Sequence, residues 1–265
     1  MRSCLLRLCV ALAALWLAGC ATMGDSAPTR DLRTESDQSD AERRARVRLE
    51  LASAYFGRGQ LSTALDEVKL ALAAKPNAFD AYNLRGLIYA AMGENLLAEE
   101  SFQRALQLNA RDGDTMQNYG WFLCQQRRFD EAEKHFQLAM AQPQYTGVVR
   151  TSFAQGVCFA RAGRWAEAER SLSRSYELDP TNPVTAYNLA EVLLQRKEFE
   201  RARFYVRRIN AVPEQVNAQS LWLAARIERR MDNMTTAQQF GRQLRERFPQ
   251  SPEALQFEQG RFDEQ

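Results

Sequence analysis

Helix-length segments with alternating apolar and polar faces follow one another through residues 45–251. Pro76, Pro180 and Pro249 each come just after one such segment, and proline is common where a helix has ended. A frame that begins 31 residues before each of these prolines divides the region into six units with spacings of 34 to 36 residues. The units cover residues 45–78, 79–112, 113–146, 149–182, 183–216 and 218–251. The pattern predicts six consecutive helical hairpins.

Two positions of this frame always carry small residues. The eighth is Ala52, Gly86, Gly120, Gly156, Ala190 and Ala225, and the twentieth is Ala64, Ala98, Ala132, Ala168, Ala202 and Ala237. A larger side chain there would push the paired helices apart, because a protein interior has no spare volume. This signature at a period of about 34 residues resembles the tetratricopeptide repeat. The resemblance implies an all-α fold, a right-handed superhelical solenoid of six helix-turn-helix repeats.

Larger apolar residues occupy the eleventh and twenty-fourth positions of the first five units. These are Tyr55, Tyr89, Leu123, Phe159 and Leu193, and then Val68, Phe102, Phe136, Leu172 and Val206. The sixth unit has Glu228 and Gly241 instead, which we expect of a solvent-facing end unit. Ser251, Pro252 and Glu253 form an N-cap, a first-turn proline and a first-turn acid. They predict a short closing helix over the sixth repeat.

The N-terminal segment indicates export. Arg2 and Arg7 precede an apolar run over residues 8–18, which is typical of a signal peptide and too short to span a membrane. The sequence from Leu17 to Cys20 resembles a bacterial lipobox. That resemblance implies cleavage after residue 19, attachment of fatty acids such as palmitate to Cys20 and, with alanine at position 21, sorting to the outer membrane. An ordinary secretory signal with a chance cysteine is the alternative.

The predicted domain plan is a signal peptide (1–19), a lipidated tether (20–40) and a repeat domain with its closing helix (41–265). Residues 21–40 carry almost no large apolar residue and cannot support a core. Without Arg2 and Arg7 the 35 basic residues fall to 33, equal to the 33 acidic ones. This balance gives no electrostatic argument for nucleic acid as a partner.

The cysteines fall into two groups. Cys4 and Cys9 leave with the predicted signal peptide and Cys20 is the predicted lipidation site, so Cys124 and Cys158 remain. Both lie on first helices of consecutive repeats, and an exported protein meets an oxidising compartment. A disulfide between Cys124 and Cys158 is therefore predicted. Two buried free thiols are the alternative.

Nothing in the sequence indicates catalysis. The single histidine, His135, lies at a variable position of a predicted second helix and reads as solvated surface. We find no catalytic motif, metal-ligand cluster or phosphate-binding glycine loop, and acidic pairs such as Glu167 and Glu169 read as helix surface. We therefore predict a non-enzymatic binding protein with no metal, no cofactor and no small-molecule substrate.

The first helices provide a candidate binding surface. In tetratricopeptide domains their positions 2, 5, 9, 12 and 13 line the concave side. Large apolar residues at these positions are Leu49, Phe56, Leu87, Trp121, Phe153, Val157, Tyr187, Leu194 and Trp222. A row of exposed apolar residues is typical of a protein interface. The alternative is that some of them pack against neighbouring helices.

The bound segment is predicted to be apolar. Tetratricopeptide domains that clamp a C-terminal carboxylate use lysine and asparagine where this chain has Leu49 and Ser53, and the next clamp position is Leu84. A carboxylate clamp is therefore not formed in the first repeats. An amphipathic helix or strand suits this surface better.

One stretch points to a narrower family. Asn118-Tyr119-Gly120-Trp121-Phe122-Leu123-Cys124 is followed by Phe129-Asp130-Glu131-Ala132, Phe136, Pro143-Gln144-Tyr145 and Gly156-Val157-Cys158. With the lipobox and six repeats, these resemble the PilF/PilW family of type IV pilus biogenesis lipoproteins over essentially the whole chain. The resemblance implies a pilotin on the periplasmic face of the outer membrane. Its partner would be a subunit of the secretin pore, and its role would be in pilus formation and twitching motility. A repeat lipoprotein serving other outer-membrane or cell-wall assembly machinery is the alternative.

Overall fold

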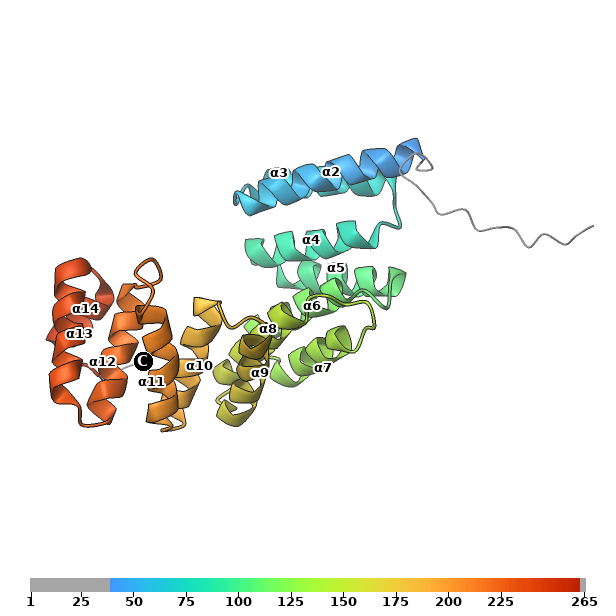
Figure 1. Cartoon of the computed structure of the whole chain (residues 1–265). Helices are drawn as coiled ribbons and strands as arrows, with labels where there is room; N and C mark the ends of the chain where they lie inside the picture. The colour runs from blue at the N-terminus through green and yellow to red at the C-terminus, as the bar shows by residue number, and fades with distance from the viewer. Residues whose placement is uncertain (1–38, 263–265) are drawn as a thin grey trace, which may run out of the picture. The chain divides into compact units, whose positions relative to one another are not determined.

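The computed structural model describes residues 39–262, so the predicted signal peptide and Cys20 lie outside the described residues. Within that range it contains thirteen α-helices and no β-strand (Figure 1). They are α2 (Asp40–Gly57), α3 (Leu61–Ala74), α4 (Phe79–Met92), α5 (Asn95–Leu108), α6 (Gly113–Gln125), α7 (Phe129–Met140), α8 (Val148–Arg161), α9 (Trp165–Leu178), α10 (Pro183–Gln195), α11 (Phe199–Asn210), α12 (Ala218–Arg230), α13 (Met234–Arg247) and α14 (Pro252–Glu258). None of these helices has both the length and the apolar character needed to cross a bilayer.

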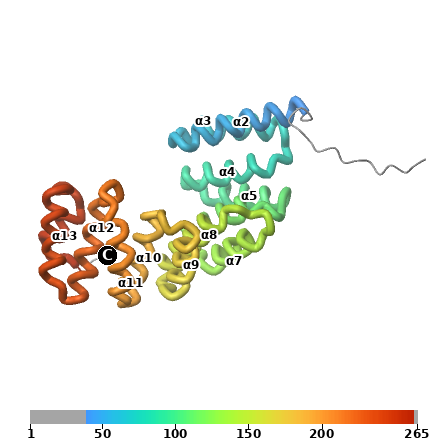
Figure 2. Tube along the Cα trace, in the orientation of Figure 1, coloured from blue at the N-terminus to red at the C-terminus, as the bar shows by residue number. Residues whose placement is uncertain are grey.

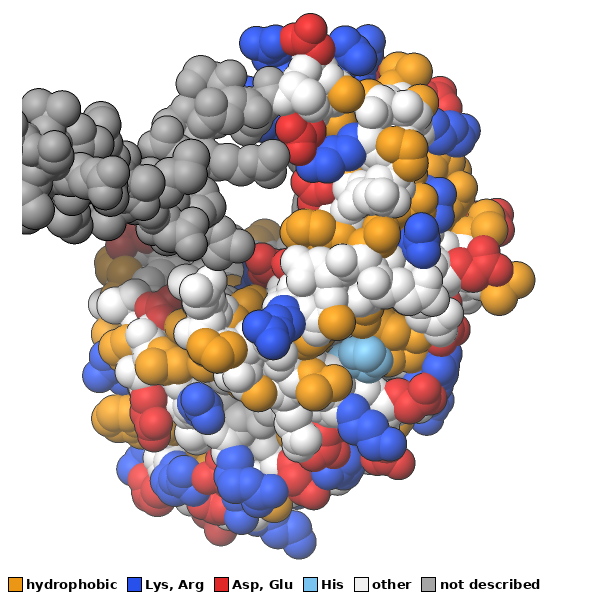
Figure 3. All heavy atoms as spheres, turned by 90° about the vertical axis from the view of Figure 1, so that its right-hand side faces the viewer, with side chains coloured by type: hydrophobic (Ala, Val, Ile, Leu, Met, Phe, Trp, Pro, Cys, Tyr) orange, Lys and Arg blue, Asp and Glu red, His pale blue; other side chains and the backbone are white. Residues whose placement is uncertain are grey.

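The helices form six hairpins, from α2–α3 to α12–α13, and α14 follows the sixth (Figure 2). Helices α4, α6, α10 and α12 begin at the first residues of their predicted units. The prediction of an all-α fold built from six helix-turn-helix repeats is confirmed. In Figure 3, hydrophobic groups on the face shown are separated by polar and charged ones.

Local capping explains where several helices begin. The side chain of Asp112 accepts a hydrogen bond from the backbone N–H of Thr115, and Asn182 caps α10 with Pro183 in the first turn. At the start of α14, the backbone N–H of Ala254 donates to Ser251 Oγ at 3.1 Å, as the sequence predicts. These caps satisfy backbone N–H groups that have no partner inside the helix.

The turn inside each hairpin needs a left-handed backbone at the fifteenth position of the repeat. Glycine meets this need in three repeats, at Gly59, Gly93 and Gly163, with φ of 73°, 82° and 73°. Side-chain-bearing residues occupy it in the other three, at Arg127, Lys197 and Asp232, with φ of 60°, 62° and 60°. Left-handed backbone costs a non-glycine residue on the order of 1 kcal/mol, so these three turns carry a small conformational strain.

Within a repeat, the eighth residue of the frame packs directly against the twenty-fourth. A Cβ placed on Gly86 would lie 2.7 Å from the Phe102 ring, and one on Gly156 would lie 2.6 Å from Leu172 Cγ. Both distances are shorter than a carbon–carbon contact allows. The eighth position is therefore glycine because a bulky partner already fills the space between the two helices.

The same pair of positions explains why alanine replaces glycine elsewhere. Repeats one and five combine Ala52 with Val68 and Ala190 with Val206, and all four side chains are buried. Valine is smaller than phenylalanine, so one methyl group fits opposite it. The two positions thus hold complementary volumes, and this keeps the two helices of each hairpin in close contact.

In the sixth repeat, a side chain of α14 fills the space beside Gly241. A Cβ on Gly241 would lie 1.8 Å from Phe257 Cζ, so the Phe257 ring fills the space that a large residue at position twenty-four fills in other repeats. The predicted closing helix is confirmed in this contact. Phe257 and Phe262 also pack on Trp222, with ring centroids 6.4 and 4.9 Å from that of the indole.

The expectation that Glu228 faces solvent is wrong. Glu228 is only 2 % exposed. Arg207 Nη2 lies 3.2 Å from its Oε1, and Asn233 Nδ2 donates to its Oε2 at 2.8 Å. Burial of this carboxylate is tolerated because it is hydrogen-bonded on both oxygens. The acid therefore joins α11, α12 and the turn before α13.

Candidate partner-binding face

The first helices of successive repeats are neighbours in the structure. Direct contacts join α4 to α6, α6 to α8, α8 to α10, and α10 to α12, and side chains of α2 and α4 share one hydrophobic cluster. Positions 2, 5, 9, 12 and 13 of these helices therefore belong to one continuous surface, which we call the first-helix face. This is the face on which the sequence analysis places the partner.

Seven of the nine predicted contact residues are partly exposed on this face. They are Leu49, Phe56, Leu87, Trp121, Phe153, Val157 and Tyr187. Each also packs against the buried core of its own region, so one side of the residue is covered and the other remains accessible. The predicted row of apolar groups is present, although none of the nine is fully exposed.

Two of the nine predicted residues are too deeply buried to serve as open contacts. Trp222 is 5 % exposed because the closing segment covers its indole with Phe257 and Phe262. Leu194 is 7 % exposed and belongs to the core shared by the fourth to sixth repeats. Trp222 is therefore removed from the partner-binding set, and Leu194 offers only a small accessible edge.

Charged groups accompany the apolar row. The Arg161 guanidinium lies over the Trp121 ring, 5.0 Å from its centroid, which is cation–π geometry. Further along, the Tyr187 hydroxyl donates to Glu191 at 3.1 Å, and Arg226 donates to the same carboxylate at 2.9 Å. Burial is the main cause that raises the pKa of Tyr187, so its hydroxyl remains a neutral donor.

A disulfide joins two of the first helices beneath this face. Cys124 on α6 and Cys158 on α8 are bonded, with their Cα atoms 5.8 Å apart. Both residues are almost fully buried, at 1 % and 3 % exposed. The bond ties the third repeat to the fourth between Trp121 and Val157, two of the predicted contact residues.

The single histidine, His135 on α7, is more enclosed than the sequence suggests. Its ring centroid lies 4.4 Å from that of Tyr119, and its Nδ1 is buried with no hydrogen-bond partner among the described residues. The Tyr119 hydroxyl donates to Glu99 at 2.7 Å, and Arg128 donates to both oxygens of that carboxylate at 2.8 Å. Burial and the Glu99 contact raise the pKa of Tyr119 to about 12. His135 is therefore half-buried in a cluster between α5, α6 and α7, so its reading as solvated surface holds only in part.

This cluster predicts a loss of stability under mild acid. Burial lowers the pKa of His135 below the ordinary histidine value, so the unfolded chain takes up this proton before the folded one. Stability should then fall as pH drops below about 6.5. The Arg128 hydrogen bond also lowers the pKa of Glu99, but that contribution is lost only below about pH 4.5. We expect the Tm to fall between pH 7.5 and 5.5, as followed by circular dichroism.

His135→Phe is the matched variant, because the chain has a single histidine. The decrease in Tm over this pH range should largely disappear in it. An equal decrease in both proteins would show that another group controls the acid response.

A metal centre is not evident in the described part of the chain, where no group of three or more His, Cys, Asp or Glu side chains could hold an ion.

The described residues form a set of stacked helical hairpins with an apolar and partly charged face. These features define a protein of the tetratricopeptide-repeat class. Family models described as tetratricopeptide repeat match residues 79–112, 125–183 and 159–226.

Whole-chain relatives narrow the class to one family. The chain is 30 % identical over 249 residues to the type IV pilus assembly protein PilF of Pseudomonas aeruginosa PAO1, covering 94 % of this chain and 96 % of that protein. The chain belongs to the PilF/PilW family. The crystal structure of PilW, described as a widely conserved type IV pilus biogenesis factor, matches with a TM-score of 0.75 and 28 % identity over 80 % of this chain and 97 % of PilW. The solved structure of P. aeruginosa PilF matches with a TM-score of 0.72 and 25 % identity, over 84 % of this chain and 100 % of that one.

Proposed function

We propose that this protein is an outer-membrane lipoprotein that binds a secretin subunit through its first-helix face and promotes the localisation and multimerisation of that subunit. This role would serve type IV pilus biogenesis and twitching motility. The observation that carries the proposal is the 30 % identity to PilF over nearly the whole length of both chains. The partly exposed apolar row on the first helices supports a protein partner.

The N-terminal sequence supports the membrane part of the proposal. Cys20 follows Leu17-Ala18-Gly19 and would carry the lipid, and several acyl chains together anchor a protein effectively permanently. The predicted tether, residues 20–40, would span roughly 25 Å on average as a random coil. The repeat domain would therefore stay close to the periplasmic surface of the outer membrane, free to turn toward its partner.

Physical chemistry explains why a secretin subunit needs such a partner. Before it oligomerises, a pore-forming subunit exposes apolar surface and unpaired strand edges, which promote aggregation. A rigid helical face can cover one segment of that subunit while the lipid carries the complex to the membrane. Because the lipid is held in the membrane and the helical face holds the subunit, the effective concentration of subunits rises where the pore forms.

We place the main contact on the first two repeats, around Leu49, Phe56 and Leu87, because these repeats follow the proposed anchor in the chain. Phe56→Glu combined with Leu87→Glu should abolish secretin multimers and surface pili, since a charge cannot enter an apolar contact without a large desolvation cost. The measurements are immunoblots for heat-stable multimers and a twitching assay, with circular dichroism to verify the helical fold.

Leu138→Glu is the matched control, because Leu138 is 51 % exposed on the second helix α7 and lies off the first-helix face. This variant should assemble multimers normally. Normal multimers in the Phe56 and Leu87 double variant would contradict the placement of the contact on the first two repeats.

A further inference from the structure

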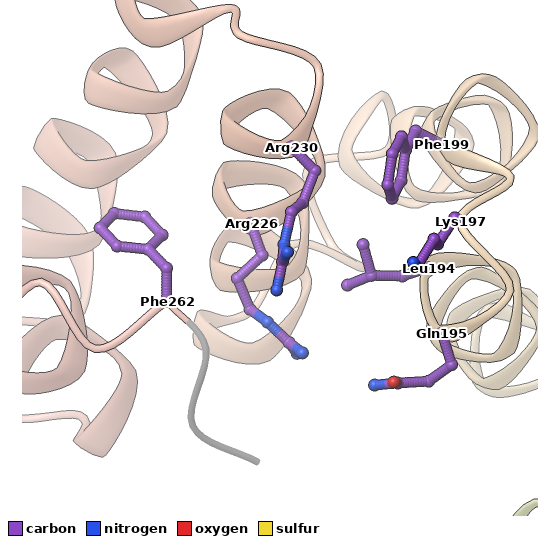
Figure 4. A pocket seen from close by; sticks show the side chains of 7 residues that line it. All are labelled: Leu194, Gln195, Lys197, Phe199, Arg226, Arg230 and Phe262. Atoms are coloured by element: carbon purple, nitrogen blue, oxygen red, sulfur yellow. The ribbon is translucent and has the colours of Figure 1, made fainter.

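A cationic cavity lies on the first-helix face between the fifth and sixth repeats. Its volume is about 370 Å³. Arg226 and Arg230 project into it from α12, while Leu194 and Gln195 face them from α10 (Figure 4). The lining is completed by Lys197, in the turn before α11, by Phe199, the first residue of α11, and by Phe262. None of these described lining residues is acidic, so the cavity combines three cations with three apolar side chains.

Arg226 is the most constrained of the cations. Its side chain is only 12 % exposed, and Nη1 donates to Glu191 at 2.9 Å. Its Nε is buried and has no hydrogen-bond partner among the described residues. A buried donor without a partner is costly, and a guanidinium can satisfy two carboxylates from different edges. Glu191 therefore satisfies only part of the hydrogen-bonding capacity of Arg226.

Lys197 contributes the third cation of the lining. Lys197 occupies the left-handed fifteenth position of its repeat, with φ of 62°, where three other repeats have glycine. Glycine would adopt this conformation without steric cost. Arg127 and Asp232 have the same conformation in their repeats, but of these three residues only Lys197 lines the cavity.

We propose that this cavity binds a carboxylate carried by the partner polypeptide, either an Asp or Glu side chain or a C-terminal carboxylate. Arginine and lysine would hold the anion by charge-assisted hydrogen bonds. An apolar side chain next to it would pack on Leu194, Phe199 or Phe262. The apolar walls favour a peptide carboxylate over a bare inorganic anion. The partner segment would then be acidic at the fifth and sixth repeats and apolar along the earlier ones.

This inference deepens the proposed function, since it names the chemistry of the segment that the face would bind. The sequence predicts an apolar ligand, because the first repeat has Leu49 and Ser53 where a carboxylate clamp would need lysine and asparagine. The proposed carboxylate site lies four repeats further along the chain, so one ligand can be apolar at the first repeats and acidic at the last. Of the nine predicted contact residues, only Leu194 lines the cavity.

The test uses NMR titration of the folded chain with three short probes, read from backbone amides and arginine Nε–H signals. The probes are acetyl-Leu-Phe-Glu-Leu-amide, its Gln counterpart, and acetyl-Leu-Phe with a free C-terminal carboxylate. We expect the Arg226 Nε–H signal to shift with a carboxylate probe and the Gln probe to bind at least tenfold more weakly. The two carboxylate probes distinguish a side-chain source from a chain end. Inorganic phosphate serves as the bare-anion control and should bind more weakly than the preferred peptide.

Two variants and a matched control separate binding from stability. Lys197→Gly should weaken binding of the acidic probe at least threefold while the Tm stays equal or rises, because the backbone is relieved. Arg127→Gly gives the same backbone relief outside the cavity and should leave binding unchanged. Arg230→Gln should also weaken binding at least threefold.

Binding of the Gln probe as tight as that of both carboxylate probes, or unchanged binding in both cavity variants, would overturn the proposal. Binding that occurs only after deletion of residues 263–265 would also overturn it, because the natural occupant would then be the acidic end of this chain. The titration uses no secretin, so its failure leaves the multimer test with Phe56 and Leu87 unaffected, and the reverse also holds.

Discussion

Phe102→Val should destabilise the protein by about 2–4 kcal/mol, and adding Gly86→Ala to it should restore most of that loss. The single valine leaves a cavity where a fully buried ring stood. Gly86→Ala alone should cost about 1–2 kcal/mol, because overpacking against the ring outweighs the better helix propensity of alanine. Together the two substitutions recreate the alanine–valine pair that the first and fifth repeats already use.

Urea denaturation followed by circular dichroism measures this cycle. We expect the double variant to be at least about 1.5 kcal/mol more stable than the sum of the single effects predicts, which is a strong coupling for two residues in contact. Additive effects would mean that the eighth and twenty-fourth positions are not matched in volume. The reverse pair of substitutions in the first repeat, Ala52→Gly with Val68→Phe, tests the same two positions independently.

The second large effect concerns the bond between α6 and α8. Replacing Cys124 and Cys158 by alanine should lower the free energy of unfolding by about 3–4 kcal/mol, because the bond closes a loop of 34 residues in the unfolded chain. The corresponding decrease in Tm is roughly 10 °C. Intact-mass analysis with and without reductant verifies that the pair is oxidised in protein isolated without reductant.

The reduced wild-type protein is the natural comparison for the double alanine variant, and the two should have similar Tm values. If both thiols are alkylated before reduction, the pair is not bonded in the cell and the predicted difference should vanish. Because the bond lies beneath Trp121 and Val157, its loss should also loosen the middle of the first-helix face.

The sequence predicted the hairpins well because their determinants are local. Small residues at the eighth and twentieth positions, and caps such as Ser251, act within one hairpin or one turn, so a repeating frame reveals them. The same frame placed seven of the nine candidate contact residues, Leu49, Phe56, Leu87, Trp121, Phe153, Val157 and Tyr187, at partly exposed positions of first helices. These features require no knowledge of how distant segments meet.

The errors arose where packing depends on a segment outside the repeating frame. Trp222 has the position of a contact residue, but the closing segment covers it, and only the folded chain shows where Phe257 and Phe262 lie. Glu228 appeared to be a solvent-facing substitution because its partners come from another helix and a turn. The cationic cavity was missed because its lining is drawn from two repeats and from Phe262.

The packing of α14 also limits how copies of this protein can associate. A stack of similar hairpins has two complementary ends, and head-to-tail contacts between such ends generate open-ended filaments. Here α14 occupies the last end through Phe257 and Trp222. At the other end Val47 is 46 % exposed, whereas the residues at its position in the later repeats, such as Ala81 and Thr115, are 0 % exposed. With one exposed end and one covered end, copies of this protein can pair but cannot polymerise by stacking.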